Sequence, residues 1–209
     1  MSQRHAPSPS TRVAVPPRAG EHAGLHPTSA GVITWDGVAL AELTQDGGLS
    51  EVGVVFQEFG QYWFSAADNI AVGAVGRRSD DQAIRAAAER AGATEFIMAL
   101  PHGFDTPLGV EVEGGTDLSG GQWQRIAIAR VLFRDASFLI MDEPTAALDA
   151  EAEAALFGTI TELAQGHTVI LISHRFSTVR SADRILVLDH GKLTEEGPHT
   201  RTTPLRHRR

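Results

Sequence analysis

The hydrophobic and polar positions of the chain follow two periods, one typical of strands and one typical of helices. Continuous apolar runs, as expected for strands buried on both faces of a sheet, occur at Val52 to Phe56, Phe138 to Met141 and Thr168 to Ser173. Helical patterns cover Asp80 to Ala91, Thr94 to Leu100, Gln122 to Phe133 and about Ala150 to Leu163, and Thr94 is expected to cap the second of these helices. Strands that alternate with helices predict an α/β fold with a parallel core sheet.

Two further pairs of segments are predicted to form antiparallel strands. Gly31 to Gly37 ends in an Asp-Gly turn, and Val38 to Leu43 continues after it as a second edge segment. Near the end of the chain, Arg184 to Asp189 and Leu193 to Glu195 flank the turn His190-Gly191-Lys192. No regular structure is expected in residues 1–30 or beyond Pro198, where residues 200–209 form a basic tail.

The length and the composition of the chain exclude several classes of protein. The chain has 209 residues, enough for one domain with a substantial core, and it contains no cysteine. A disulfide framework and a thiolate metal site are therefore ruled out, and a reducing compartment is compatible. Its apolar runs are far shorter than the roughly 20 residues of a membrane-spanning helix.

The charge is distributed unevenly along the chain. Residues 1–30 carry +2 and residues 198–209 carry +4, which leaves −14 on residues 31–197 out of a net charge of −8. An acidic body argues against nucleic acid as a partner, because binding to a phosphate backbone needs a basic surface. Arg206-His207-Arg208-Arg209 could contact an anionic lipid or nucleic acid, but a solubilising tail is favoured.

The run Leu118-Ser119-Gly120-Gly121-Gln122 places small residues where a helix begins. Backbone amides at such a helix start can approach a phosphate closely, and the helix dipole favours an anion there. Thirteen residues after Arg125 begins a buried strand that ends in Asp142 and Glu143. One such carboxylate can hold Mg²⁺ beside a triphosphate, and its neighbour can act as general base toward water. Together the two runs indicate the chemistry of ATP hydrolysis.

In this order, the two runs resemble the signature motif and the Walker B strand of ATP-binding cassette (ABC) ATPases. Three further matches are Gln57, the pair Leu148-Asp149, and His174 after the strand that starts at Thr168. Taken alone, each match can be explained as an ordinary turn, helix start or polar strand end. The occurrence of all the matches in this order favours the family. The resemblance implies an ABC ATPase fold over residues 31–199, with a partial antiparallel β-subdomain and a helical signature subdomain at about 66–133.

The resemblance also implies a role for each matching residue. Asp142 would bind Mg²⁺, Glu143 would be the general base, and His174 would sense the γ-phosphate. Gln57 would position water or metal and relay the nucleotide state. The residues implied to contact ATP on the signature side are Ser119, Gly120, Gly121, Gln122 and Asp149.

The implied partners are a second ABC ATPase domain, which shares the bound ATP, and a transmembrane transport domain. The stretch Phe59 to Ile70 resembles the exporter segment that contacts such a domain, although an ordinary aromatic loop is the alternative. Val112 to Gly115 falls where exporters have a subunit-contact loop, and simple turn chemistry explains it equally well. The chain is therefore expected at the cytoplasmic face of a membrane, held there by its partner.

One element of the family pattern is missing from the sequence. Phosphate loops of this class read G-x-x-x-x-G-K-[ST], and the chain has no such run. Its only lysine, Lys192, follows Walker B, and Pro16-Pro17 interrupt the stretch from Ser8 to Glu21 where the loop and its helix would lie. We therefore expect the first core strand and the phosphate loop to be missing, ATP affinity to be low, and stability alone to be marginal.

Three functional hypotheses follow. The first is an ATP-binding subunit of an exporter-like ABC transporter, catalytically impaired on its own. The second is a non-catalytic interaction module that supplies its signature half-site to an intact partner, and the third is a remnant without function. An ABC ATPase of DNA repair fits poorly, because no coiled-coil heptads separate the motifs.

Overall fold

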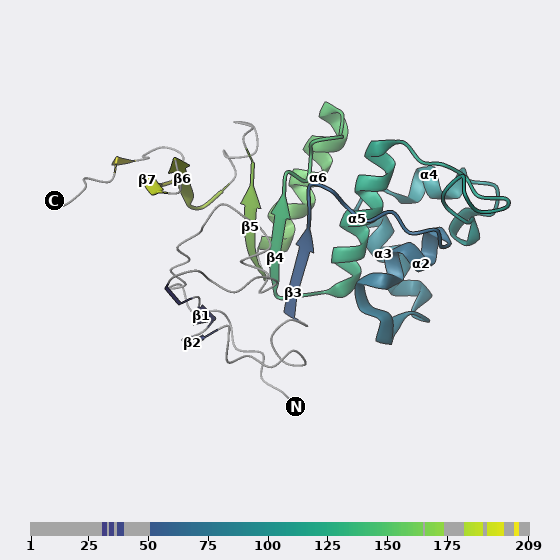
Figure 1. Ribbon diagram of the computed structural model, residues 1–209, viewed down its shortest axis with the longest axis horizontal. Coiled ribbons are helices and arrows are strands. Elements are labelled where there is room, and N and C mark those ends of the chain that lie inside the picture. Colours follow the sequence, from purple (N-terminus) through teal and green to yellow (C-terminus); the bar gives the residue numbers. More distant parts are fainter. Residues whose placement is uncertain are drawn as a thin grey trace. The chain divides into compact units, whose positions relative to one another are not determined.

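The computed structural model describes residues 31–32, 34–35, 37–39, 51–164, 166–173, 182–189, 192–198 and 203–204. These fall into two compact units, one of residues Ser50–Leu171 and one that combines Met1–Leu49 with Ile172–Arg209. Each unit is described by itself (Figure 1). His174, predicted above to be a site residue, lies outside the described residues.

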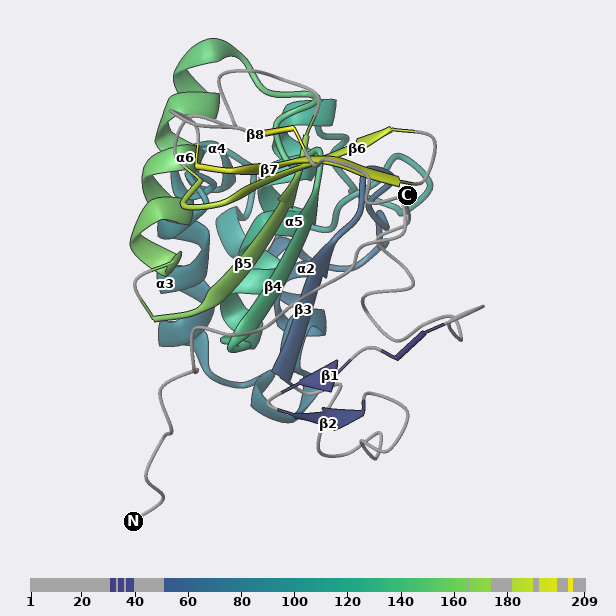
Figure 2. The same ribbon diagram turned by 90° about the vertical axis from the view of Figure 1, so that its left-hand side faces the viewer.

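A three-stranded sheet carries the strand ends on which the site was predicted. It consists of β3 (Val52–Val55), β4 (Phe138–Asp142) and β5 (Thr168–Ile172), in that spatial order. β3 and β4 are parallel, with Val52 opposite Phe138 and Val55 opposite Met141. The three arrows point the same way in Figures 1 and 2. The predicted α/β fold with a parallel core sheet is thus confirmed.

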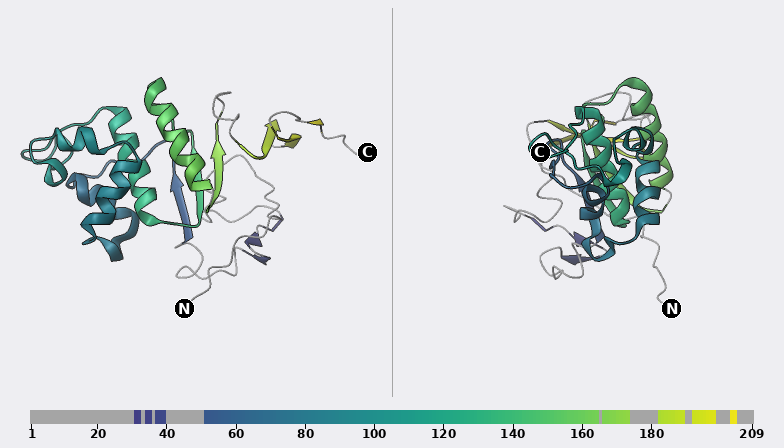
Figure 3. Two further views of the ribbon diagram at one scale, coloured as in Figure 1. Left: turned by 180° about the vertical axis from the view of Figure 1, so that it is seen from behind. Right: turned by 90° about the vertical axis from the view of Figure 1, so that its right-hand side faces the viewer.

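Helix α6 (Ala150–Ala164) lies against one face of this sheet, as the view from behind shows (Figure 3). It buries Leu156 and Ile160, while Glu151 and Glu153 occupy its first turn. Acidic residues in a first turn complement the positive end of the helix dipole.

The remaining helices of this unit lie between β3 and β4 in sequence. They are α2 (Ala66–Ala71), the 3₁₀ segment η3 (Val72–Arg77), α3 (Asp81–Arg90), α4 (Thr94–Met98), the 3₁₀ turn η4 (Gly103–Asp105) and α5 (Gly120–Arg134). Helices α3 and α5 begin and end within two residues of the predicted bounds. Asp80 caps α3 by accepting from the amide of Ala83, and Gly92 follows that helix with φ +64°.

Two local interpretations of the sequence are corrected by the structure. The alternative that Phe59 to Ile70 is an ordinary loop holds only as far as Ser65, because α2 begins at Ala66 after Ser65, whose hydroxyl accepts from the amide of Asp68. Thr94 does not cap α4: the helix has no side-chain cap, and the buried Thr94 hydroxyl has no partner in the structure.

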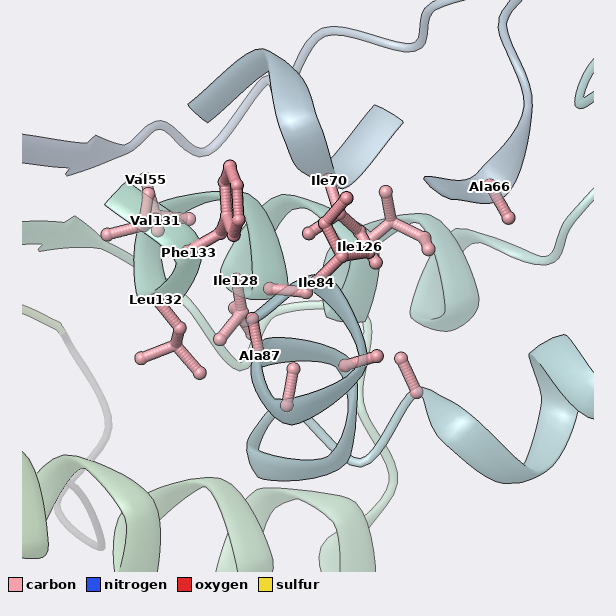
Figure 4. Close-up of a cluster of buried hydrophobic side chains, with 14 of the residues drawn as sticks. Val55, Ala66, Ile70, Ile84, Ala87, Ile126, Ile128, Val131, Leu132 and Phe133 are labelled. Carbon is pink, nitrogen blue, oxygen red and sulfur yellow. The ribbon is translucent and has the colours of Figure 1, made fainter. Parts of the chain in front are cut away.

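The hydrophobic core forms where α5 meets α2 and α3 (Figure 4). Ile126 and Ile128 of α5 are fully buried, as is Ile70 of α2, and Ile84 of α3 is almost fully buried. Near the other end of α5, Val131 and Phe133 pack with Val55 of β3. Burying side chains of this size stabilises the fold by about 1.5 to 3 kcal/mol each. The core therefore fixes α5, whose first residues carry the signature run.

The described residues of the other unit form two small antiparallel sheets. β1 (Thr34–Trp35) pairs with β2 (Val38–Ala39) across Gly37, whose φ is +84°. β6 (Ile185–Asp189) pairs with β7 (Lys192–Gly197), as predicted. β7 also pairs with β8 (Thr203–Pro204), a two-residue strand in a segment where the sequence predicted no structure.

Candidate functional site

A hollow of about 530 Å³ opens at the N-terminus of α5. Its lining includes Ser119, Gly120, Gly121 and Gln122 from the signature run and Asp149 from the turn before α6. These are the five residues that the sequence implied for the signature side of an ATP site. The structure therefore brings all five together.

A capping box shapes the floor of this hollow. The Ser119 hydroxyl accepts from the amide of Gln122 at 3.3 Å, and the Gln122 side-chain oxygen accepts from the amide of Ser119 at 2.9 Å. Both side chains keep a donor, namely the Ser119 O–H and the Gln122 amide N–H₂. The amides of Gly120 and Gly121 lie in the first turn and have no acceptor within the helix. This set of donors matches the oxygens of a phosphate, so the residues present fit the terminal part of a nucleotide.

Of the two glycines in the signature run, Gly121 is required by a close approach. A Cβ atom at Gly121 would lie 2.9 Å from the carbonyl oxygen of Ala147, whereas one at Gly120 would meet only the Ala147 Cβ at 3.8 Å. The start of α5 thus packs directly on the turn that follows β4. A side chain at Gly121 would push the two apart.

Asp149 has a structural partner of its own. Its Oδ1 accepts from the amide of Ala152 at 2.9 Å, and its carbonyl accepts from the amide of Glu153 at 2.8 Å. Asp149 therefore begins α6 while its side chain lines the hollow, which fixes the far wall of the hollow to that helix.

The second group of predicted residues stands at the end of β4. Asp142 is the last residue of the strand, and Glu143 follows it with φ +47°, a left-handed conformation that is uncommon for a residue other than glycine. Burial, and next the neighbouring Glu143 carboxylate, raise the pKa of Asp142. Carboxylate oxygens are ligands that Mg²⁺ prefers, and a cation beside Asp142 would stabilise its ionised form, so the pair fits Mg²⁺.

Gln57 lies two residues after the end of β3 and is exposed. Since Val55 stands opposite Met141 in the parallel ladder, Gln57 follows β3 at the same edge of the sheet at which Asp142 and Glu143 follow β4. The described site residues therefore form two groups, the signature hollow and this carboxylate end of the sheet.

Sequence reasoning missed four residues at or beside the hollow, one of which is Ala147 in its lining. Phe96 of α4 and Arg125 of α5 also line it, and Arg125 donates to the carbonyl of Gly92 at 3.2 Å. Gln124 is 2% exposed and lies two residues after the signature run, in α5. No sequence pattern distinguishes Gln124 from an exposed helical glutamine, so its burial is known only from the fold.

Comparison with known proteins agrees with this geometry. The model of the family described as ABC transporter matches residues 22–146. The chain belongs to the ABC transporter family. It is 43% identical over 173 residues to the β-(1→2)glucan export ATP-binding/permease protein NdvA of Agrobacterium vitis, an alignment that covers 83% of this chain and 29% of the relative. It is 44% identical over 169 residues to the ATP-dependent lipid A-core flippase of Saccharophagus degradans, over 81% of this chain and 28% of that protein.

A solved structure gives the same assignment. A bacterial Atm1-family ABC exporter with ATP bound superimposes with a TM-score of 0.79 at 38% identity, over 87% of this chain and 31% of that one. The fold is therefore that of the ATP-binding domain of exporter-type ABC proteins. The chain spans about three tenths of the length of these relatives. Within the described residues, no helix combines the length and apolarity needed to cross a bilayer.

Proposed function

We propose that this ABC domain binds Mg-ATP jointly with a second ABC ATPase domain and couples the nucleotide to a transmembrane transport domain. The observation that carries the proposal is the signature hollow, whose floor presents backbone and side-chain donors at the start of α5. In this division of work the hollow supplies one half of a nucleotide site, and the partner domain supplies the phosphate loop.

The residues at the carboxylate end of the sheet would bind the metal and activate water. Mg-ATP would supply a metal and an electrophilic γ-phosphorus. Asp142 would hold the metal through its carboxylate, Glu143 would accept a proton from the attacking water, and Gln57 would orient that water or the metal. His174, which follows the β5 residues in the sequence and lies outside the described residues, is assigned to the γ-phosphate on the same family grounds.

Hydrolysis by this chain alone is expected to be weak. A phosphate loop contributes several charge-assisted hydrogen bonds, each worth about 1.5 to 3 kcal/mol, and the chain has neither the G-x-x-x-x-G-K-[ST] run nor a lysine before Lys192. The combined loss corresponds to several orders of magnitude in affinity. The hollow does not depend on that loop, because all its lining residues come from α4, α5 and the turn before α6.

Contact with a transmembrane domain has its own support. Tyr62, Trp63 and Phe64 form an exposed aromatic segment, with Trp63 60% exposed. The rings of Tyr62 and Phe64 stack at a centroid distance of 6.0 Å, which holds the segment in one arrangement. Adjacent exposed rings are typical of surfaces that bind protein or enter a membrane interface. The domain would accordingly work at the inner face of a membrane, attached through this segment.

The decisive experiment measures Mg-ATP binding by calorimetry and ATPase activity by phosphate release, for the chain alone and mixed with an ABC ATPase domain that has an intact phosphate loop. We expect little binding by the chain alone and a gain of activity in the mixture. Ser119→Arg, which fills the hollow, should remove the gain, whereas Ser79→Arg, at an exposed turn, should preserve it. A gain that survives Ser119→Arg would refute the shared site.

A further inference from the structure

Gln124 lies one turn into the signature helix, and both ends of its side-chain amide are hydrogen-bonded to the turn that follows β4. Its Nε2 donates to the carbonyl of Glu143 at 3.3 Å, and its Oε1 accepts from the amide of Ala147 at 3.1 Å. The side chain is 2% exposed. A buried amide with both functions paired in this way has only one favourable orientation, since a flip would oppose two donors and two acceptors.

The hydrogen bonding of this turn is complete only with the Gln124 side chain. The carbonyl of Glu143 accepts from the amide of Ala146, and the carbonyl of Thr145 accepts from the amide of Leu148, both at 3.1 Å. The amide of Ala147, between these two turns, has Gln124 as its acceptor. Gln124 therefore joins the beginning of the turn to its end.

The two ends of this turn belong to different parts of the site. Its beginning is Glu143, held at φ +47° beside Asp142. Its end is Ala147, whose carbonyl lies against Gly121 in the wall of the signature hollow. Backbone held in a sparsely populated conformation persists only where its surroundings fix it, and the Gln124 amide is one such constraint.

We propose that Gln124 is a positioning residue that links the signature hollow to the Glu143 carboxylate. A phosphate that binds to the first turn of α5 displaces this turn against Ala147. The Gln124 amide transfers the displacement to the backbone of Glu143. Nucleotide in the half-site shared with the partner then adjusts the general base at the end of β4. This inference rests on the proposed function for its ligand, whereas the link itself is a property of the free chain.

The test compares Gln124→Met, which keeps length and loses both hydrogen bonds, with Gln124→Glu, which keeps an acceptor for Ala147. The matched control is Gln82→Met on the exposed surface of α3. Amide hydrogen exchange of the full chain is the readout. We expect the amide of Ala147 to exchange at least about tenfold faster in Gln124→Met, because a buried donor has lost its acceptor. Gln124→Glu should keep that protection, and the amides of β4 should be unaffected in both variants.

Unchanged exchange at Ala147 in Gln124→Met would overturn the proposal, as would equal acceleration of Ala147 and of the β4 amides. Should Gln124→Met fail to fold, Gln124→Glu decides alone: Ala147 must stay protected while the amide of Ala146, which shares the Glu143 carbonyl with Gln124, changes its exchange rate.

A second arm adds Mg-ATP and the phosphate-loop-bearing partner domain. In the unmodified chain, nucleotide should slow exchange both at Ser119 to Gln122 and at Glu143 to Ala147; in Gln124→Glu it should slow only the first segment. Slowing of both segments in that variant would contradict the coupling. If neither segment responds in the unmodified chain, the proposed function and the coupling built on it fail together, while the free-chain comparison still decides whether Gln124 holds the turn.

Discussion

Arg130 and Asn69 join the signature helix to the start of α2 by two hydrogen bonds. Arg130 Nε donates to the Asn69 carbonyl at 3.0 Å, and Arg130 Nη2 donates to Asn69 Oδ1 at 3.3 Å. The guanidinium also donates to the carbonyl of Gly60 and stands 4.6 Å from the centre of the Tyr62 ring. The exposed aromatic segment is thus attached to the helix whose first turn forms the signature hollow.

Asn69 is the centre of this attachment and should be sensitive to substitution. Its Nδ2 donates to the carbonyls of Tyr62, Phe64 and Ser65 at 2.8 to 3.2 Å, and the residue is fully buried. Asn69→Leu preserves the side-chain volume, removes the Nδ2 donor from these carbonyls, which keep one backbone donor each, and removes the Oδ1 acceptor of Arg130. We expect the free energy of unfolding, measured by urea denaturation, to fall by about 2 to 3 kcal/mol.

Gln82→Leu, at an exposed position of α3, is the control and should change the free energy of unfolding by less than about 0.5 kcal/mol. Equal stability of the two variants would mean that the Asn69 hydrogen bonds add nothing beyond what water provides in the unfolded chain.

Gly73 marks the closest approach of η3 to α5. A Cβ atom there would lie 2.0 Å from the carbonyl oxygen of Arg130, and no side-chain rotation relieves that contact. We expect Gly73→Ala to lower the free energy of unfolding by about 2 to 4 kcal/mol, because the two segments must separate. Thermal and urea denaturation both report the change.

Gly76, three residues further along the same 3₁₀ segment, provides the matched comparison. A Cβ atom there meets nothing within 4 Å. Gly76→Ala should be neutral or should stabilise the fold by about 0.4 to 1 kcal/mol through the unfolded chain. A Gly73→Ala variant as stable as Gly76→Ala would contradict the close approach.

Much of the site was predictable because it depends on local sequence. Ser119 and Gln122 form a capping box, which is a short-range pattern, and the glycines beside them mark the approach of a backbone. Asp142 and Glu143 end an apolar run, and a parallel sheet brings the ends of its strands to one edge. The two groups of site residues follow from these local rules.

Features that depend on contacts between distant segments were not predictable. Gln124 has a polar side chain in a helix, and only the fold shows that its partners are Glu143 and Ala147. The start of α2 was obscured by the aromatic residues before Ser65, which resemble a loop until the buried side chain of Asn69 connects them to α2. Thr94 resembled a cap, but α4 begins at Thr94 itself, directly after Ala93.

The two signature glycines should respond differently to a methyl group. Gly121→Ala forces a contact with the Ala147 carbonyl and should lower the free energy of unfolding by about 1 to 2 kcal/mol. Gly120→Ala meets only an ordinary contact and should leave stability equal or raise it by up to about 1 kcal/mol, since alanine favours a helix. Both lie in the hollow, so both should reduce ATPase activity in the mixture with the partner domain.

For these two variants, the free energy of unfolding and the ATPase activity in the mixture must be measured separately. If Gly120→Ala retains full activity in the mixture, the amides of the first turn do not receive the phosphate as proposed. If the two variants lose equal stability, the packing of Gly121 on Ala147 is not the constraint that the geometry indicates.

Asp142 should make stability depend on pH in a defined direction. Burial, followed by the charge of Glu143, raises its pKa above the ordinary value of 3.8, so the folded chain binds a proton at this site more tightly than the unfolded chain. The contribution of Asp142 to the free energy of unfolding is therefore complete below pH 3.8 and declines as the pH rises from there through the raised pKa. Asp142→Asn removes the titrating group, and the stability of this variant relative to the unmodified chain should increase across that interval and then level off.

Urea denaturation at a series of pH values from 3.5 to 7 measures this difference, with Asp105→Asn at an exposed position as the control. Glu143→Gln removes the second cause of the shift and should reduce the pH dependence without abolishing it, because burial is the larger cause. Added Mg²⁺ should restore stability near neutral pH in the unmodified chain and leave Asp142→Asn unaffected, since a cation stabilises the ionised carboxylate. A relative stability that falls with rising pH would show that Asp142 is more stable ionised in the folded chain, and the cation site assigned to it would lose its electrostatic basis.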